Sequence, residues 1–417
     1  MSVARVPDDF CYPDGMISVD QARAFILDCA RVIAEAESVD VSEALGRVLA
    51  EAHVSAIDVP GYANSAMDGY AVRSADLSQK DQVRLKITQR ITAGVTGGSI
   101  RSGEAARIFT GAPVPDGADA VVMQERCHAD GDYVSIPGPV PAGDNVRPRG
   151  NDIVAGREVL PKGTRMRPQE MGLAASVGLA RLSVIRKPKV AIFSTGDELV
   201  KPGEPLPVGK IYNSNRYTLR GLLTALGCEI LDLGMVGDTL EATRIALQEA
   251  AGRADVIVTS GGVSVGEEDH MRAAVEAAGH IELWQVAVRP GKPLAYGRIA
   301  EADFLGLPGN PVSTLVTFCL FVRPFLLKRQ GAARLLPRPY PVRAAFEWRK
   351  AGKRREFARA RLSPEDGQAP RAEIFPKQGS DVLTSTVWAE GVVEIPEGAT
   401  VAPGDTILYY PFSDLLY

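Results

Sequence analysis

The chain has 417 residues, enough for two to four domains whose cores need no disulfide or metal to stabilise them. Its 47 basic and 51 acidic residues give a net charge of −4, which argues against a protein whose whole surface binds nucleic acid. We expect no transmembrane helix and no signal peptide, and five scattered cysteines without Cys-x-x-Cys spacing predict reduced thiols in a cytoplasmic protein.

The first 183 residues predict a β-rich module inserted between two helical segments. Ser18 and Gln21 fit the pattern of a capping box, and apolar residues recur after it at helical spacing. Further helices are expected within 42–52 and 161–183. Between 57 and 149, short β-like runs alternate with Gly and Pro turns, which predicts a compact β domain.

Residues 186–330 alternate strands with helices, which predicts a mainly parallel sheet covered on both faces. The expected strands lie at 190–193, 229–233, 255–259, 281–288, 294–296 and 304–307, and the expected helices at 217–226, 240–251, 269–278 and 312–327. After residue 334, short strands between glycines predict a small antiparallel barrel or sandwich. We therefore expect an α/β multidomain fold with a helical linking domain (1–51 and 149–183), a β-rich inserted domain (52–148), a mainly parallel three-layer α/β domain (184–331) and a C-terminal small β-barrel (332–417).

Three expected strand ends carry loops rich in glycine, hydroxyl and acidic side chains, at 194–199, 259–269 and 307–313. The carboxyl ends of parallel strands share one edge of a sheet, where such domains bind ligands. Glycines there let the backbone approach a ligand, and a helix N-terminus after the loop favours an anion. One such loop alone would be only a tight turn, but three together predict a ligand that carries phosphate or another oxyanion. None of them matches G-x-G-x-x-G or G-x-x-x-x-G-K-[ST], which argues against a dinucleotide dehydrogenase and an ordinary ATPase.

Acidic side chains are frequent at the same edge and include Asp197, Glu198, Asp238, Glu267, Glu268 and Asp269. They would repel an anionic ligand unless Mg²⁺ lay between them, since this cation is served by one or two carboxylates plus phosphate oxygens. Asp238 and Asp269 also fit a simpler role as helix N-caps. In the turn 288–293, Arg289 and Lys292 place two cations beside the third loop, which suits an oxyanion.

Two further regions have the composition of binding loops, although each alone would be interpreted as a turn or a surface. In the expected inserted domain, small residues surround Asp68 at 64–72, and 109–117 has a similar texture. In the tail, 353–361 holds five cations, and on a strand alternate residues would share one face, namely Arg355, Phe357, Arg359 and Arg361. Such a run is typical of a solvated face or a sheet edge, and anion binding is the alternative.

Together these motifs resemble the molybdopterin molybdenumtransferase family, whose members insert molybdenum in the last step of molybdenum cofactor synthesis, and the matching half of gephyrin. The resemblance runs from about residue 16 to 410 and is carried by six motifs, at 64–72, 109–115, 194–199, 260–266, 290–293 and 307–313. It implies a four-domain L-shaped subunit in an elongated homodimer, with the site between the α/β domain of one subunit and the inserted domain of the other. It also implies adenylylated molybdopterin and molybdate as substrates, the molybdenum cofactor and AMP as products, and Mg²⁺ as the metal.

The resemblance implies roles for residues that match the family motifs by position. Catalytic roles fall to Asp68 and Thr110, which would complete the partner's site, and to Glu198, Asp238, Asp269 and Lys292. Metal binding falls to Glu198, Asp238 and Asp269, and binding of the pterin phosphate or nucleotide to Ser260, Gly261, Gly262, Ser264, Gly309, Asn310 and Ser313. Molybdate binding falls to Arg289, Lys292, Arg359 and Ser380. Three positions depart from the family pattern, where an acid, an aspartate and often a lysine stand in relatives: Ala63, Asn213 and Arg289.

We interpret the chain as a transferase in which Mg²⁺ and the cations stabilise charge that develops on a cleaved phosphoanhydride. Two alternatives stay open: a nucleotidyltransferase that acts on molybdopterin in the neighbouring step, and a gephyrin-like scaffold without turnover. The full-length match argues against the first, and the lack of a long linker and a second fused domain argues against the second. The expected partners are a second copy of the chain, molybdopterin adenylyltransferase and cofactor-accepting apo-enzymes, with no nucleic acid and no membrane.

Overall fold

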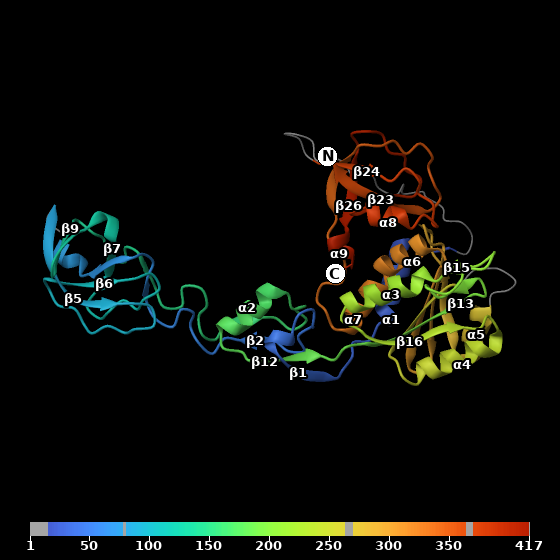
Figure 1. The fold of residues 1–417 in the computed structure, drawn as a ribbon, viewed down its shortest axis with the longest axis horizontal. Helices are drawn as coiled ribbons and strands as arrows, with labels where there is room; N and C mark the ends of the chain where they lie inside the picture. Colours follow the sequence, from blue (N-terminus) through green and yellow to red (C-terminus); the bar gives the residue numbers. More distant parts are fainter. Residues whose placement is uncertain (1–15, 78–80, 263–269, 364–369, 417) are drawn as a thin grey trace.

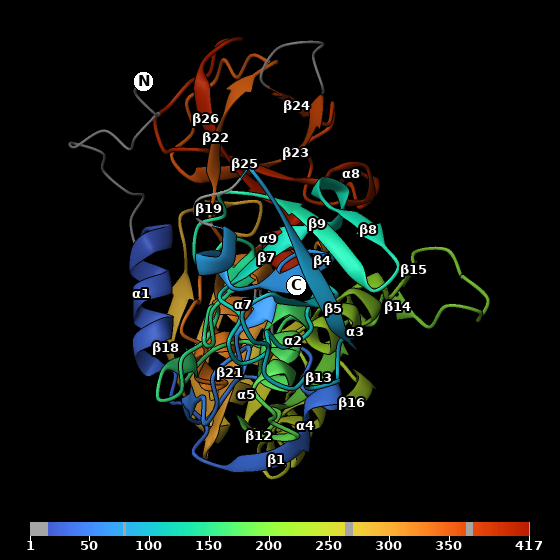
Figure 2. The same cartoon turned by 90° about the vertical axis from the view of Figure 1, so that its left-hand side faces the viewer.

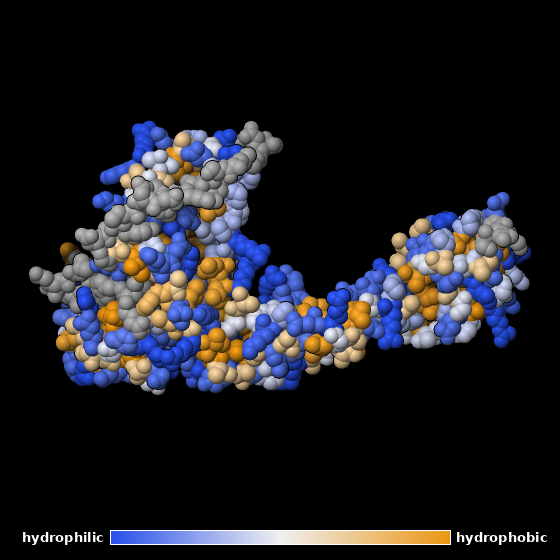
Figure 3. Space-filling model, turned by 180° about the vertical axis from the view of Figure 1, so that it is seen from behind, coloured by the Kyte–Doolittle hydropathy of each residue, from blue (hydrophilic) through white to orange (hydrophobic). Residues whose placement is uncertain are grey.

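The computed structural model describes residues 16–77, 81–262, 270–363 and 370–416. The molecule is elongated, with the inserted domain at one end and a narrow linking region that joins it to a larger body (Figure 1). In the body, the C-terminal barrel lies above the α/β domain, as both Figure 1 and Figure 2 show. The space-filling view shows a wide hollow between the barrel and the inserted domain (Figure 3).

The linking region is built mainly from short antiparallel strand pairs. β1 (Ala36–Asp40) pairs with β12 (Arg181–Ile185), and β2 (His53–Val54) pairs with β11 (Glu158–Leu160). A further bridge joins the two chain segments closer to the inserted domain, at residues 59 and 153. The chain therefore passes through the linking region in two segments that lie side by side.

Two helices predicted for this region are absent or shorter than expected. Within 42–52 the structure has only the 3₁₀ turn η1 (Val41–Glu43), because Gly46 takes a left-handed conformation and the residues after it bridge to other segments. Within 161–183 it has only α2 (Pro168–Ser176), because a left-handed glycine follows and the chain then joins β12. In both segments, strand pairing and glycine override the local apolar spacing.

The first helix, α1 (Val19–Cys29), has the predicted capping box. Ser18 Oγ accepts from the Gln21 N–H at 3.0 Å, and the Gln21 side chain accepts from the Ser18 N–H at 3.0 Å. The apolar face of α1 packs into the core of the α/β domain, where Val19 and Ile26 are buried. The helix is thus part of the body, although the division by sequence places it in the linking domain.

The inserted domain is a six-stranded sheet with apolar cores on both faces, as the β-like runs predicted. Its strand order is β7-β4-β6-β5-β9-β8. The strands are β4 (Gly69–Val72), β5 (Gln82–Ile91), β6 (Glu104–Ile108), β7 (Ala120–Met123), β8 (His128–Asp130) and β9 (Tyr133–Pro137), with 3₁₀ turns η2 (Ser74–Leu77) and η3 (Gln124–Arg126). A separate pair joins β3 (Asn64–Ser65) to β10 (Val146–Arg147).

The α/β domain has a sheet of order β16-β13-β17-β21-β20-β18. The strands are β13 (Lys189–Thr195), β16 (Glu229–Val236), β17 (Val256–Ser260), β18 (His280–Gln285), β20 (Pro293–Ile299) and β21 (Ala302–Leu307). The first four in sheet order run parallel, and β20 runs antiparallel to both of its neighbours, β21 and β18. Helices cover both faces over two separate apolar cores, namely α3 (Ser214–Ala225), α4 (Leu240–Ala251), α5 (His270–Ala278), α6 (Pro311–Thr317) and α7 (Arg323–Arg329). The predicted alternation of strands and helices is confirmed.

One helical run in this domain, Pro311–Arg329, is long and apolar enough to cross a membrane by length and composition alone. It consists of α6, the π-helical turn η4 (Phe318–Val322) and α7. Because 89% of its most apolar window is buried inside the protein, it is a core helix.

The C-terminal domain is a closed barrel rather than a sandwich. Its strands are β22 (Tyr340–Ala344), β23 (Arg355–Ser363), β24 (Arg371–Ile374), β25 (Gly391–Ile395) and β26 (Thr406–Pro411), with helices α8 (Thr384–Trp388) and α9 (Phe412–Leu416). The sheet closes because β25 pairs with both β26 and β23.

A short strand from the α/β part of the chain, β19 (Val288–Arg289), belongs to the sheet of the barrel. It pairs in parallel with β23, so that Val288 lies opposite Arg355 and Arg289 lies opposite Glu356. The single strand predicted at 281–288 is therefore wrong: the chain leaves the α/β sheet after β18 and joins the barrel. This change of sheet carries the turn 290–293 to the junction of the two domains.

A buried cation ties the barrel to α1. Arg355 lies 2.9 Å from Asp20 and 3.3 Å from Glu394 through Nη1, and its Nε lies 3.1 Å from Glu397. Glu397 is fully buried. Although burial disfavours the charged form, the carboxylates raise the pKa of Arg355 above its ordinary value. Arg355 is therefore the counter-ion of a carboxylate that water cannot reach.

We expect Arg355→Met to lower the free energy of unfolding by about 3–5 kcal/mol, because it leaves the buried Glu397 carboxylate without its cation. Urea denaturation followed by tryptophan fluorescence measures the change. Arg361→Met is the matched control, since Arg361 stands on the same strand but pairs with Glu373 at the surface, and it should cost below about 1 kcal/mol. Equal losses from the two substitutions would contradict the role of Arg355.

Candidate functional site

A cavity of about 990 Å³ lies between the strand ends of the α/β sheet and the barrel. Residues of all three predicted loops line it, among them Thr195, Ser260 and Gly309. The register pairs Ser194 with Ser260 and Ser260 with Leu307, so β13, β17 and β21 end at one level. The prediction that these loops meet at one edge of the sheet is confirmed.

The cavity has three walls. The sheet edge contributes Thr195, Ser260, Gly261, Pro308, Gly309, Asn310, Pro311 and Ser313. The chain from the end of β13 to the first residues of α3, which includes the parallel pair β14 (Leu199–Val200) and β15 (Ile211–Tyr212), contributes Glu198, Leu199 and 211–215. The barrel side contributes 289–293, Arg354, 378–381 and Leu383. A ligand in the cavity would therefore contact both domains.

Two glycines in these walls cannot be replaced without strain. Gly261 has φ +90°, and a Cβ there would lie 3.1 Å from the carbonyl oxygen of Thr195. Gly291 has φ +110°, and a Cβ there would lie 2.5 Å from Cγ2 of Thr317. Only glycine combines these backbone angles with such close packing, so bare backbone forms the cavity surface at both positions.

Hydrogen bonds join the third loop, 307–313, to the rest of the α/β domain and to the barrel. Asn310 Nδ2 donates to Ser380 Oγ at 2.9 Å, and the Val312 N–H donates to the Ser380 carbonyl at 3.0 Å. Asn215 Nδ2 donates to the Gly309 carbonyl at 2.7 Å. The structure thus brings together Asn310 and Ser380, which the sequence assigned to nucleotide and molybdate binding respectively.

The barrel side of the cavity is cationic. Arg289 and Lys292 line it, and Arg289 pairs with Glu356 at 2.8 Å. Burial raises the pKa of Glu356 above its ordinary value, although Arg289 opposes the shift. Arg289 nevertheless keeps 57% of its side chain exposed and can reach a ligand.

Arg359, also predicted to bind molybdate, does not line the cavity. Its side chain is buried, with Nε donating to Ser385 Oγ at 3.0 Å and Nη2 donating to the Gly379 carbonyl at 3.0 Å. Burial lowers the pKa of Arg359 to about 10. In this structure Arg359 lies behind the wall and holds the 378–381 segment in place. The interpretation of the cation run as a solvated face is wrong for Arg355 and Arg359.

The other predicted residues divide into three groups. Glu198, Ser260, Gly261, Gly309 and Ser313 line the cavity together with the residues described above. Asp238 follows β16 and Gly262 lies in the second loop, and neither lines the cavity. Ser264 and Asp269 lie outside the described residues.

The cap of α4 differs from one prediction. Thr239, not Asp238, is the N-cap residue, and its side chain accepts from the Ala242 N–H at 3.2 Å. Asp238 stands one residue before the cap, half-buried.

Asp68 and Thr110 lie in the inserted domain, at the far end of the molecule from the cavity (Figure 1). They stand next to each other because Asp68 directly precedes β4, Thr110 follows β6, and Gly69 of β4 pairs with Ile108 of β6. Asp68 Oδ1 accepts from both the N–H and the Oγ of Thr110 at 2.8 Å. These two hydrogen bonds lower the pKa of Asp68. One chain alone does not bring this pair to the cavity.

Sequence reasoning missed several polar lining residues, among them Arg354, Asn215 and Gln378. Arg354 lies in the predicted cation run, but the face assigned to anion binding was that of the odd-numbered residues. The alternation of side chains along a strand could have identified Arg354, since it places Arg354 and Glu356 together on the opposite face.

The described residues contain no group of three His, Cys, Asp or Glu side chains that could hold a metal by themselves. Glu198 lines the cavity and is exposed, so its carboxylate is free to join a cation that also binds ligand phosphates. Mg²⁺ fits such a site, because it commonly takes one or two carboxylates and completes its shell with phosphate oxygens and water.

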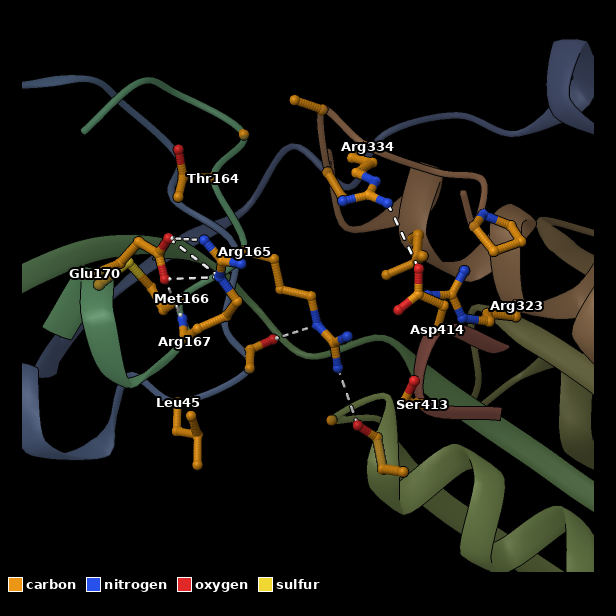
Figure 4. A pocket seen from close by; sticks show the side chains of 18 of the residues that line it. Leu45, Thr164, Arg165, Met166, Arg167, Glu170, Arg323, Arg334, Ser413 and Asp414 are labelled. Atoms are coloured by element: carbon orange, nitrogen blue, oxygen red, sulfur yellow. Dashed lines mark hydrogen bonds and ion pairs between the residues drawn. The ribbon is translucent and has the colours of Figure 1, made fainter. Parts of the chain in front are cut away.

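A second cavity of about 740 Å³ lies where the linking region meets α3, α7 and the C-terminus (Figure 4). It is rich in arginine, but its guanidinium groups bind within the protein. Arg165 donates to the carbonyl of Ala225 at 3.0 Å, Arg167 pairs with Glu170, and Arg334 lies 3.7 Å from Asp414. None of the described residues predicted for the site lines this cavity. Among these contacts, that of Arg165 with Ala225 holds the linking region against the body.

Three family models match the chain, in the order of its domains. The MoeA N-terminal region (domain I and II) matches residues 17–178, a probable molybdopterin binding domain matches 191–328, and the MoeA C-terminal region (domain IV) matches 341–412. The second of these holds the three loops of the cavity, and the third holds the barrel that closes it.

Similar proteins match over nearly the full length. The molybdopterin molybdenumtransferase of Haemophilus influenzae is 38% identical over 96% of this chain and 100% of its own, and that of Bacillus subtilis is 34% identical over 87% and 86%. The crystal structure of a molybdopterin biosynthesis MoeA protein from Pyrococcus horikoshii superposes with a TM-score of 0.76 at 33% identity, over 95% of this chain and 99% of that one. The chain therefore belongs to the MoeA family, the molybdopterin molybdenumtransferases that insert molybdenum into molybdopterin during molybdenum cofactor synthesis.

Proposed function

We propose that the cavity between the α/β domain and the barrel binds adenylylated molybdopterin together with molybdate, and that molybdenum insertion there releases AMP. The observation that supports this most is the meeting of three glycine-containing strand-end loops with a cationic wall in one cavity. Bare backbone and hydroxyl groups suit phosphate oxygens, and fixed cations suit an oxyanion. In this proposal the phosphate groups bind at the sheet edge and molybdate binds at the cationic wall.

The residues of the chain have distinct tasks in this proposal. Ser260 and Ser313, both buried at the sheet edge, offer hydroxyl groups to phosphate oxygens. Arg289 and Lys292 bind the anionic oxygens from the other side and stabilise charge that develops when the phosphoanhydride is cleaved. Mg²⁺ would be held by Glu198 with Asp269, and with Asp238 if this residue, which does not line the cavity here, moves toward it; there Mg²⁺ would neutralise phosphate charge.

The first test is AMP release from adenylylated molybdopterin and Mg²⁺, with and without molybdate. We expect AMP release that depends on molybdate. AMP release that ignores molybdate would favour the nucleotidyltransferase alternative, and tight binding without AMP release would favour a scaffold. We expect omission of Mg²⁺, with chelator added, to abolish AMP release. Release at full rate in chelator would contradict the Mg²⁺ proposal.

We further propose that the chain acts as a homodimer in which Asp68 and Thr110 of one subunit complete the cavity of the other. Their distance from the cavity within one chain supports this arrangement (Figure 1). Apolar areas also interrupt the hydrophilic surface of the linking region (Figure 3), where Leu45, Val54 and Val154 are exposed. Such areas are typical of an interface.

A mixed dimer tests the shared site. Asp68→Asn and Lys292→Ala should each inactivate the homodimer, whereas a heterodimer of the two variants contains one site with both native residues. We expect about half the wild-type AMP release from a doubly tagged, purified heterodimer, because one of its two sites is intact. An inactive heterodimer would show that both residues belong to a site within one chain.

The hydrogen bond from Thr110 gives a pH prediction for Asp68. In Thr110→Val the Oγ bond is lost and the backbone bond stays, so the pKa of Asp68 should rise toward its ordinary value. Carboxyl NMR titration measures the shift, and the acid limb of AMP release should move to higher pH. Thr110→Ser keeps the hydroxyl and should leave both unchanged. An unmoved titration in the valine variant would rule out the contribution of the hydroxyl.

We place this activity in the cytoplasm, beside molybdopterin adenylyltransferase as the supplier of substrate and cofactor-accepting apo-enzymes as recipients of product. The chemistry supports such neighbours, because an adenylylated substrate requires a nucleotidyl transfer before this step. Co-purification of the three classes of protein from cells tests the assignment.

A further inference from the structure

Arg354 occupies a defined position at the junction of the two domains. It stands directly before β23, whose next residues pair with β19: Arg355 lies opposite Val288 and Glu356 opposite Arg289. Because successive side chains of a strand point to opposite faces, Arg354 and Glu356 point away from the face that Arg355 occupies. Arg354 accordingly lines the cavity, whereas Arg355 binds the carboxylates behind it.

The charge of Arg354 is less compensated than that of its neighbours. Glu356 forms an ion pair with Arg289, and Arg355 contacts three carboxylates. Arg354 has only a long hydrogen bond from Nη1 to the Val288 carbonyl, at 3.5 Å, and no described carboxylate forms an ion pair with it.

The burial of Arg354 and the charges around it also favour a bound anion. Burial, followed by the nearby charge of Arg289, lowers the pKa of Arg354, while Glu356 opposes the shift. The same cavity wall holds Lys292, and among the described residues that line this wall Asp381 is the acidic one. A half-buried guanidinium without an ion-pair partner beside two further cations is a strong site for a tetrahedral oxyanion, which it can bind through two parallel N–H groups.

We propose that Arg354 binds an oxyanion of the substrates in this cavity, either molybdate or a phosphate group, an inference that rests on the proposed function. Arg359 cannot take this place in the described conformation, because its side chain is 1% exposed and its donors are held by Ser385 and Gly379. Arg354 is therefore a substrate-binding residue supplied by the barrel, and Arg359 is a positioning residue for the wall beside it.

The test compares Arg354→Ala and Arg354→Lys with Arg361→Ala. Arg361 is the matched control, since it stands on the same strand, pairs with Glu373 at the surface and does not line the cavity. Calorimetry with molybdate alone and with AMP alone measures binding of each oxyanion. Arg354→Ala should weaken one of them about tenfold or more, the lysine variant less, and the control within about twofold.

The two probes distinguish the two sources of the oxyanion. Loss of molybdate binding with unchanged AMP binding assigns molybdate to Arg354, and the opposite result assigns the phosphate. Unchanged binding of both in Arg354→Ala overturns the inference, as does an equal loss in Arg361→Ala. A thermal unfolding curve for each variant identifies misfolding. If Arg354→Ala misfolds, the binding measured for Arg354→Lys, which keeps the charge and the aliphatic stem, decides the question. Wild-type protein that binds neither anion and releases no AMP would refute the proposed function itself.

Discussion

The short pairing of β19 with β23 is the interaction on which the cavity depends. Through it, the α/β chain and the barrel share a hydrogen-bonded ladder and not only a packed surface. β19 ends with Arg289 and the turn after it carries Lys292, so the same pairing that joins the domains brings both cations to the cavity. A shift of one residue would exchange the faces of β23 and move Arg354 away from the ligand space. The register of two residues thus determines the chemistry of one wall.

β23 separates two clusters of charge that serve different purposes. On one face, Arg355 neutralises the buried Glu397 and ties α1 to the barrel. On the other face, Glu356 pairs with Arg289 and leaves Arg354 facing the cavity. A buried charge must be matched nearby or it destabilises the fold, whereas an unmatched charge beside a cavity is available to a ligand. The alternation of a strand keeps these requirements apart by a single residue.

The features that follow from local pattern could be predicted from the sequence. Alternating strands and helices placed the loops of Ser260 and Ser313 at one sheet edge, and the capping box of Ser18 marked the first helix. Features set by long-range pairing could not. The segment 42–52 has helical spacing, but it pairs with distant residues, and Arg359 is buried because the barrel closes around it. The face of β23 that meets the cavity depends on β19, whose change of sheet has no local signal.

The two chain segments of the linking region have a consequence for how this architecture can vary. The inserted domain departs and returns through β2 and β11, which are hydrogen-bonded neighbours, and its sheet and both its cores are complete within it. Its two ends are therefore adjacent, and the body keeps its strand order whether or not the domain is present. The inserted domain is therefore attached as a self-contained unit. One genetic event could change its length or its sequence, while the cavity walls that the same subunit supplies stay as they are.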